Sequence, residues 1–307
     1  MLMAMFPVIQ VPDNAAEIPE ALGTKPKFWF TDNNNRLTLY KEGRPGSGEN
    51  WAEKFCCEIC RKLEIPHAEY ELAEWKGRKG VISEMFVPEG GRLVFGNELL
   101  AKMVPNYPHT RRFRARQHTV RLAMAVIGSK LVKYSFGFDA PTVFRSAADV
   151  FVGYLLLDAL VANQDRHHEN WALIVIVNQG VVLAPTFDHA SSLGRNERDE
   201  ERLRRLKTRD KGSSLEHYAN RATSAFYVSP TSSKPLTTLE AFAEAARISS
   251  DAAQYWLRQL GKVSIYDFES IMVRIPASEM SDAARQFALK LIEINRERLL
   301  GMLAGNL

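Results

Sequence analysis

Two apolar runs in the middle of the chain flank a short polar turn. The first run covers 171–177, the turn is Asn-Gln-Gly at 178–180, and the second run covers 181–184. Apolar, largely β-branched runs joined by such a turn predict a β-hairpin. A hairpin returns its second strand to the level at which the first began. We therefore expect Asn170, which enters the hairpin, to lie beside Asp188, which follows it.

A second pair of short apolar segments lies in the N-terminal third. Segments 28–30 and 36–41 flank an Asp- and Asn-rich turn at 32–35, and this pattern predicts another hairpin. Side chains alternate along a strand, so Leu39 and Lys41 are expected to share one face.

Helical periodicity begins after a polar, glycine-containing link. Phe55, Ile59 and Leu63 recur at a spacing of four, which predicts a helix over 51–63 that ends near Pro66. Two strand-like segments follow this helix, and the last two thirds of the chain are mainly helical outside the central hairpin. The expected strands are 69–73 and 81–86, and the expected helices are 147–162, 239–246, 251–260, 265–273 and 281–303.

Polar side chains with coordination and acid–base chemistry surround the central hairpin. Asp165 lies in the run Asn-Gln-Asp-Arg-His-His-Glu-Asn at 163–170, and Phe-Asp-His follows the hairpin at 187–189. The hairpin would bring Asp165, Asn170 and Asp188 to one place. Two oxygen ligands for a hard cation and one carboxylate for an attacking hydroxyl are what a magnesium-dependent phosphoryl-transfer site needs. Each residue type is common in turns, so the joint spacing carries the signal.

The order Asp-x-His-x-x-Asn, hairpin, Asp resembles the catalytic loop and metal-binding aspartate of the protein-kinase-like superfamily. The Asp-Arg-His form at 165–167 is similar to two branches, the HipA-like serine/threonine kinases of bacterial toxin–antitoxin systems and the phosphatidylinositol kinases. The segment Lys-Leu-Glu-Ile-Pro-His-Ala-Glu-Tyr-Glu-Leu at 62–72 resembles the helix-to-strand break of the HipA-like family and favours that branch. The resemblance covers roughly 22–303. It implies an α+β, two-lobed protein-kinase-like fold, with a small β-rich N-lobe at 1–86 and a larger, mainly helical C-lobe at 87–307.

The resemblance also implies a nucleotide-binding set. Lys41 matches the lysine that pairs with the phosphates, and Leu39 matches the aliphatic residue against adenine. The alternative for this hairpin is an ordinary surface hairpin with a solvated lysine. Backbone groups of the hinge between the lobes would contact the adenine edge. The implied residues are Gly23, Thr24, Lys25 and Lys27 in a loop over the phosphates, Leu39 and Lys41 in the strand, and Glu84, Met85 and Phe86 in the hinge.

Catalytic and metal-binding roles follow from the same resemblance. Asp165 corresponds to the catalytic base or hydroxyl-orienting group, and Asn170 and Asp188 correspond to the Mg²⁺ ligands. His167 is expected to pack beneath the loop and to position Asp165 by hydrogen bonding.

Two residues keep alternative assignments. Glu53, in the first turn of the expected helix, is either the catalytic partner that holds Lys41 or the N3 residue of a capping box begun by Asn50. Glu49 is a weaker candidate for the lysine partner. Arg166 either stabilises phosphate or pairs locally.

Composition narrows the compartment and the ligand class. The 307 residues are 46% hydrophobic and carry a net charge of +4, enough for a large core and compatible with phosphate-bearing ligands. No run of about 18 apolar residues is present, so we expect no membrane span.

Three clustered cysteines make a poor disulfide framework and indicate a reducing cytoplasm. A zinc site that adds His67 is disfavoured, because adjacent Cys56 and Cys57 cannot both face one metal from a helix. We interpret the thiols of Cys56, Cys57 and Cys60 as buried core groups.

The sequence as a whole predicts an ATP- and Mg²⁺-dependent serine/threonine protein kinase of the HipA-like type. The resemblance implies a toxin that phosphorylates a protein, such as a translation factor or an aminoacyl-tRNA synthetase, and that an antitoxin protein restrains. The alternatives are a lipid or small-molecule kinase and a kinase fold kept only for binding. The basic segment 111–118 fits a solvated helix face better than a nucleic-acid contact, and we expect no direct contact with nucleic acid.

Overall fold

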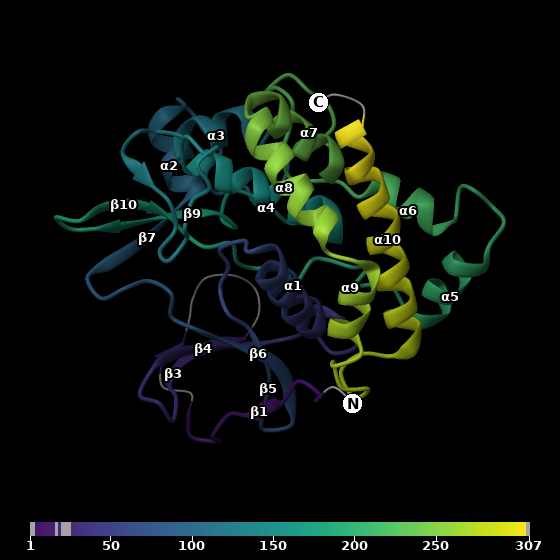
Figure 1. Cartoon of the computed structure of the whole chain (residues 1–307). Helices are drawn as coiled ribbons and strands as arrows, with labels where there is room; N and C mark the ends of the chain where they lie inside the picture. Colours follow the sequence, from purple (N-terminus) through teal and green to yellow (C-terminus); the bar gives the residue numbers. More distant parts are fainter. Residues whose placement is uncertain (1–3, 16–17, 20–25, 305–307) are drawn as a thin grey trace.

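The computed structural model describes residues 4–15, 18–19 and 26–304 (Figure 1). A β-rich part and a larger helical part pack against each other, with helix α1 between them. The strands are β1 (Val8–Gln10), β2 (Ile18–Pro19), β3 (Lys27–Thr31), β4 (Leu37–Glu42), β5 (Glu71–Trp75), β6 (Arg78–Glu84), β7 (Gly91–Phe95), β8 (Val132–Lys133), β9 (Ala172–Ile176) and β10 (Gly180–Leu183). The helices are α1 (Glu49–Leu63), α2 (Gly96–Met103), α3 (Val120–Ile127), α4 (Ala147–Val161), α5 (Asp199–Lys207), α6 (Leu215–Arg221), α7 (Thr238–Ile248), α8 (Ser250–Lys262), α9 (Ile265–Met272) and α10 (Asp282–Ala304).

A six-stranded sheet in the order β1-β5-β6-β4-β3-β2 forms the N-terminal part. The hairpin predicted for 28–41 is confirmed, since β3 and β4 pair antiparallel with Lys27 opposite Lys41. The two faces of β4 differ, because Thr38 and Tyr40 are buried whereas Leu39 and Lys41 are only partly buried. This alternation turns the face of Lys41 away from the small aromatic core around Tyr40.

Helix α1 joins the two parts of the molecule. Its buried side chains, among them Trp51, Phe55 and Ile59, belong to the same hydrophobic core as those of α4 and α8. The division into lobes at residue 86 stays a prediction, and one continuous core spans the proposed boundary.

Helix α4 is the centre of the larger part, and all of its residues are buried. Neighbouring helices α3, α7, α8 and α10 surround it (Figure 1). Gly153 lies where Trp256 of α8 crosses α4, and a Cβ atom there would stand 2.6 Å from the indole ring. Glycine at this position therefore permits the close approach of the two helices.

The central hairpin is confirmed as well. Strands β9 and β10 pair antiparallel, with Leu183 opposite Leu173. They form a four-stranded sheet in the order β7-β9-β10-β8, and Figure 1 shows this hairpin projecting from the helical part. The outer strands β7 and β8 were not anticipated, because pairing between distant segments leaves no local pattern.

The basic segment 111–118 differs from the prediction. It forms a loop rather than a helix face, and Arg114 in it has a φ of 61°. In the described ranges, no helix is long and apolar enough to cross a membrane.

Candidate active site

The two ends of the central hairpin lie together, and Arg166 spans them. Its Nη1 donates to the backbone oxygen of Asn170 at 2.8 Å and to that of Phe187 at 3.5 Å. Because Asp188 follows Phe187 directly, the predicted convergence of Asn170 with Asp188 is present in the fold.

A buried ion pair fixes the loop that carries these residues. The guanidinium of Arg166 donates to both carboxylate oxygens of Asp158 in α4, at 2.8 and 2.7 Å. Asn163 donates to the same carboxylate at 2.8 Å. The bidentate geometry holds the loop against α4, all of whose residues are buried. Of the two alternatives left open for Arg166, the structure shows local pairing.

Asp165 lies on this anchored loop, and its side chain is partly buried. Its backbone N–H donates to the Asn163 side chain at 3.1 Å, and the hydroxyl of Ser191 donates to its Oδ2 at 3.2 Å. Its Oδ1 is buried and, within the described ranges, has no hydrogen-bond partner. A buried carboxylate oxygen without a partner is costly unless another group reaches it during function.

His167 lies beside that oxygen, with Nε2 3.6 Å from Asp165 Oδ1. The backbone N–H of Glu169 donates to His167 Nδ1 at 3.1 Å, so Nε2 carries the proton of the neutral ring. Burial lowers the pKa of His167 to about 4, which keeps the ring neutral at pH 7. The 3.6 Å separation is too long for the predicted hydrogen bond, and a positioning role for His167 stays a prediction.

Burial, with a smaller contribution from the charge of Asp188, raises the pKa of Asp165 to about 6. If Asp165 accepts the proton of the attacking hydroxyl, its protonated form is inactive. We therefore expect kcat/KM for MgATP to fall roughly tenfold per pH unit below a break near 6, and to level off above it.

Replacing Ser191 with alanine provides a matched variant for this pH profile. The Ser191 hydroxyl stabilises the charged carboxylate and so lowers the pKa of Asp165. Its removal should move the break in kcat/KM to higher pH without changing the plateau greatly. A profile that is flat across the acidic range, or a break that the variant leaves in place, would contradict the role of Asp165.

On the opposite side of the site, Lys41 contacts two carboxylates. Its Nζ lies 2.5 Å from Asp188 Oδ1 and 3.8 Å from Glu53 Oε2. Burial alone would lower the pKa of Lys41, but the charges of Asp188 and Glu53 raise it above its ordinary value. Lys41 therefore stays protonated. From β4 it contacts helix α1 through Glu53 and the segment after the hairpin through Asp188.

Glu53 has tertiary partners and does not cap its own helix. Helix α1 begins at Glu49 after the N-cap Gly48, so the capping box with Asn50 is wrong. Instead, Glu53 Oε1 accepts the backbone N–H of His189 at 2.7 Å. Burial opposes its charge, but Lys41 and the contact with His189 lower the pKa of Glu53 overall.

Glu49, the weaker candidate for the lysine partner, contacts other residues. It accepts the backbone N–H of Arg44 at 2.9 Å and forms an ion pair with Arg195. These contacts tie the start of α1 to the segment after the hairpin. Glu53 is the glutamate whose ion pair with Lys41 is observed.

The predicted nucleotide-binding residues fall into three groups. Gly23, Thr24 and Lys25 lie outside the described residues. Lys27 and Leu39 lie on β3 and β4 beside Lys41, Lys27 directly opposite it. In the hinge, Glu84 forms an ion pair with Arg36, and the Met85 N–H donates to Leu37 O at 2.9 Å. The hinge amide of Met85 is thus engaged with β4, and the ring of Phe86 stacks against that of Phe187.

The donor set at Asn170 and Asp188 fits a hard divalent cation. The Nδ2 of Asn170 donates to the backbone oxygen of Asp165 at 2.7 Å, which orients the side chain so that its oxygen is the end available as a ligand. Asp188 adopts a φ of 57°, and Tyr70 accepts its backbone N–H at 3.2 Å. The Asp188 carboxylate already contacts one cation, the Lys41 ammonium, so a positive charge is favoured at this position. Oxygen donors of this kind suit Mg²⁺.

Several contributors were not found from the sequence. Ser191 and Tyr70 act through single hydrogen bonds, to Asp165 and to the Asp188 amide. The loop 111–116 also reaches the site, because Arg112 pairs with Glu169 at 2.6 Å and Phe113 packs edge-on against His167. The sequence shows that this segment is basic and aromatic. It does not show that the segment folds against the loop that carries Asp165.

The chain belongs to the family of HipA-like C-terminal domains, whose model matches residues 20–260. Among solved structures, the proinflammatory kinase CtkA of Helicobacter pylori has a TM-score of 0.71 at 19% identity, covering 96% of this chain and 99% of that chain. A chain of the HipA, HipB and operator DNA complex of Shewanella oneidensis MR-1 has a TM-score of 0.56 at 12% identity, covering 98% of this chain and 68% of that chain. No curated protein matches the sequence.

These comparisons confirm two predictions made from the sequence. The family is HipA-like, and the fold is the α+β, two-lobed, protein-kinase-like fold. The roles of individual residues rest on the geometry described above.

Proposed function

We propose that the protein is an ATP- and Mg²⁺-dependent phosphotransferase that phosphorylates a serine or threonine of a protein. The observation that supports this most directly is the constellation of Lys41 between Glu53 and Asp188, with Asp165 on the anchored loop opposite. Membership of the HipA-like family supports the same reaction class.

Each residue has a distinct task in this proposal. Lys41, held by Glu53, binds the phosphates of ATP. Asn170 and Asp188 would hold Mg²⁺. The ion, when bound, neutralises phosphate charge and helps to align the terminal phosphoryl group for in-line transfer.

Asp165 acts on the acceptor. Its Oδ1 receives the proton of the attacking hydroxyl as the new O–P bond forms, and the bond between the terminal phosphorus and the bridging oxygen breaks to release ADP. The Ser191 hydroxyl keeps the carboxylate oriented, and the neutral ring of His167 lies beside it. This assignment gives the partnerless buried oxygen a function.

The HipA-like resemblance supports a narrower proposal about biology. The target would be a translation factor or an aminoacyl-tRNA synthetase, and an antitoxin protein would restrain the kinase. The similar Shewanella chain comes from a toxin–antitoxin complex, which supports such a partner. The three cysteines are free and buried thiols, which fits the cytoplasm as the proposed location.

A transfer assay with radiolabelled ATP tests the proposed function. Purified translation factors, aminoacyl-tRNA synthetases and a lipid extract are offered in parallel, with Asp165→Asn protein as the control. We expect label on serine or threonine of a protein, and less label when the proposed antitoxin partner is added. Label only in the lipid extract would overturn the protein substrate, and absence of any transfer would overturn the kinase activity.

A further inference from the structure

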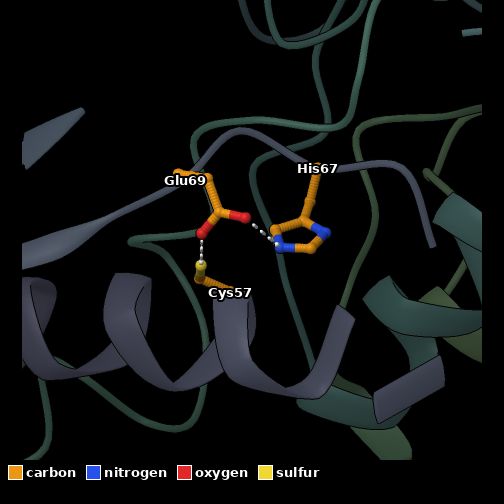
Figure 2. A group of neighbouring side chains, drawn as sticks. All are labelled: Cys57, His67 and Glu69. Atoms are coloured by element: carbon orange, nitrogen blue, oxygen red, sulfur yellow. Dashed lines mark hydrogen bonds and ion pairs between the residues drawn. The ribbon is translucent and has the colours of Figure 1, made fainter. Parts of the chain in front are cut away.

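A second group of metal-ligating side chains lies apart from the proposed magnesium ligands. Figure 2 shows Cys57 projecting from helix α1 towards His67 and Glu69, which come from the segment between α1 and β5. The Cys57 Sγ lies 3.5 Å from Glu69 Oε2, and the His67 Nε2 lies 3.4 Å from Glu69 Oε1. One sulfur, one nitrogen and one carboxylate oxygen all lie within 4.8 Å of one another.

The imidazole of His67 is oriented as a ligand. Its Nδ1 lies 2.7 Å from the backbone oxygen of Ile65, so Nδ1 carries a proton and donates it there. The lone pair of Nε2 then points at the Glu69 carboxylate. Nε2 is buried, and in the described part of the chain it has no hydrogen-bond partner. A backbone carbonyl that fixes the tautomer in this way is the usual outer contact of a metal-bound histidine.

Two acceptors that face each other at 3.4 Å need a positive charge between them. A proton can supply it, and so can a metal ion. A tetrahedral zinc site has bonds of about 2.0 to 2.3 Å, which place its ligand atoms about 3.4 to 3.6 Å apart. The Cys57–Glu69 and His67–Glu69 separations match two of those edges, each through a different oxygen of the carboxylate. All three ligand atoms lie within 4.8 Å of one another, so a small rotation of the Glu69 carboxylate would bring one oxygen to the ion.

The donor types select the metal. Thiolate and imidazole ligands favour Zn²⁺ over Mg²⁺, whereas the oxygen donors at Asn170 and Asp188 favour the reverse. The earlier objection to zinc concerned Cys56 and Cys57 as joint ligands. It does not apply to this group, which contains one cysteine and recruits Glu69 instead.

Arg61 supplies a positive charge beside Glu69. Its guanidinium forms an ion pair with Glu69 and another, at 2.5 Å, with Glu58. Its Nη2 lies 4.0 Å from Cys57 Sγ. The arginine side chain is 46% exposed, so it can release Glu69 while Glu58 continues to hold it. A bound metal would replace Arg61 as the counter-charge of Glu69.

We propose that Cys57, His67 and Glu69 bind one Zn²⁺, with water as the fourth ligand. Binding releases the proton of the Cys57 thiol and forms the Zn–S bond, with no change of oxidation state. The ion would tie α1 to the segment that leads into β5. Cys57 packs in one small cluster with Tyr70, whose hydroxyl holds the Asp188 amide, so the tie would stiffen the wall of the phosphoryl-transfer site.

The test uses the full chain, stripped of metal and titrated with Zn²⁺ and with Co²⁺ in the presence of excess Mg²⁺. We expect one equivalent of Zn²⁺ to bind, and Co²⁺ to give a thiolate-to-metal absorption band. Asp188→Asn should bind zinc as the wild type does, which separates this site from the magnesium ligands and from the proposed kinase activity.

Variants of the ligands and of their neighbours make the test specific. His67→Gln and Glu69→Gln should weaken Zn²⁺ binding by about tenfold or more, whereas Glu64→Gln, an exposed carboxylate nearby, should not. Arg61→Ala should bind Zn²⁺ more tightly, because the competing cation is gone. Zinc should raise the melting temperature of the wild type but not of Glu69→Gln. Failure to bind zinc stoichiometrically, equal affinity in all variants, or a cobalt spectrum without the thiolate band would overturn the proposal.

Discussion

Replacing Asp165 with asparagine should lower the rate of phosphoryl transfer by about 100-fold to 10,000-fold, the usual contribution of a general base. The carboxamide has nearly the same shape and can still accept the Ser191 hydroxyl, so the loop should keep its conformation. It cannot take up the proton of the acceptor. Nucleotide affinity should stay close to the wild-type value, because Lys41, Asn170 and Asp188 are untouched. Single-turnover transfer and equilibrium nucleotide binding measure the two properties separately.

The matched variant Asp188→Asn should lose nucleotide binding, which Asp165→Asn should keep. It removes the carboxylate beside Lys41 and one of the proposed Mg²⁺ ligands, so Mg²⁺-dependent nucleotide binding should be lost together with transfer. Transfer at the wild-type rate by Asp165→Asn would show that the base was assigned wrongly. Nucleotide binding by Asp188→Asn with undiminished Mg²⁺ dependence would remove the metal assignment.

The sequence predicted the parts of this site that depend on local pattern. The hairpin after Asn170 followed from two apolar runs around an Asn-Gln-Gly turn, and its geometry alone brought Asp188 back to the catalytic loop. Alternation along β4 likewise put Lys41 on the face opposite Tyr40. Both inferences use periodicities that are set by the backbone.

Contacts between distant segments could not be predicted in the same way. The sequence offered a cap for Glu53 within its own helix, but the folded chain supplies the His189 amide and the Lys41 ammonium from elsewhere. These partners compensate the buried charge, which a single capping bond at a helix end would not. Glu69 was missed as a companion of Cys57 for a related reason, since a turn between helix and strand sets their distance.

The pairing of Asp158 with Arg166 is the contact on which the whole loop depends. Both side chains are almost completely inaccessible to solvent, at 4% and 0% exposed. Asp158→Ala should therefore lower the free energy of unfolding by about 3 to 5 kcal/mol, because it leaves the Arg166 charge buried without its counter-ion. The surface pair of Arg145 with Asp251 is the control. Its side chains are 84% and 55% exposed, and Asp251→Ala should cost about 0 to 1 kcal/mol.

Urea unfolding of both variants and of the double variant Asp158→Leu, Arg166→Met measures these differences. Removing both charges should cost less stability than Asp158→Ala alone, because neither charge is then left without a counter-ion. Stability and activity should nevertheless separate in the double variant. Arg166 also donates to the backbone oxygens of Asn170 and Phe187, so a double variant that folds should still transfer phosphate poorly. Equal losses of stability for Asp158→Ala and Asp251→Ala would show that the buried pair does not anchor the loop. Full activity in the double variant would show that the hairpin ends hold their positions without Arg166.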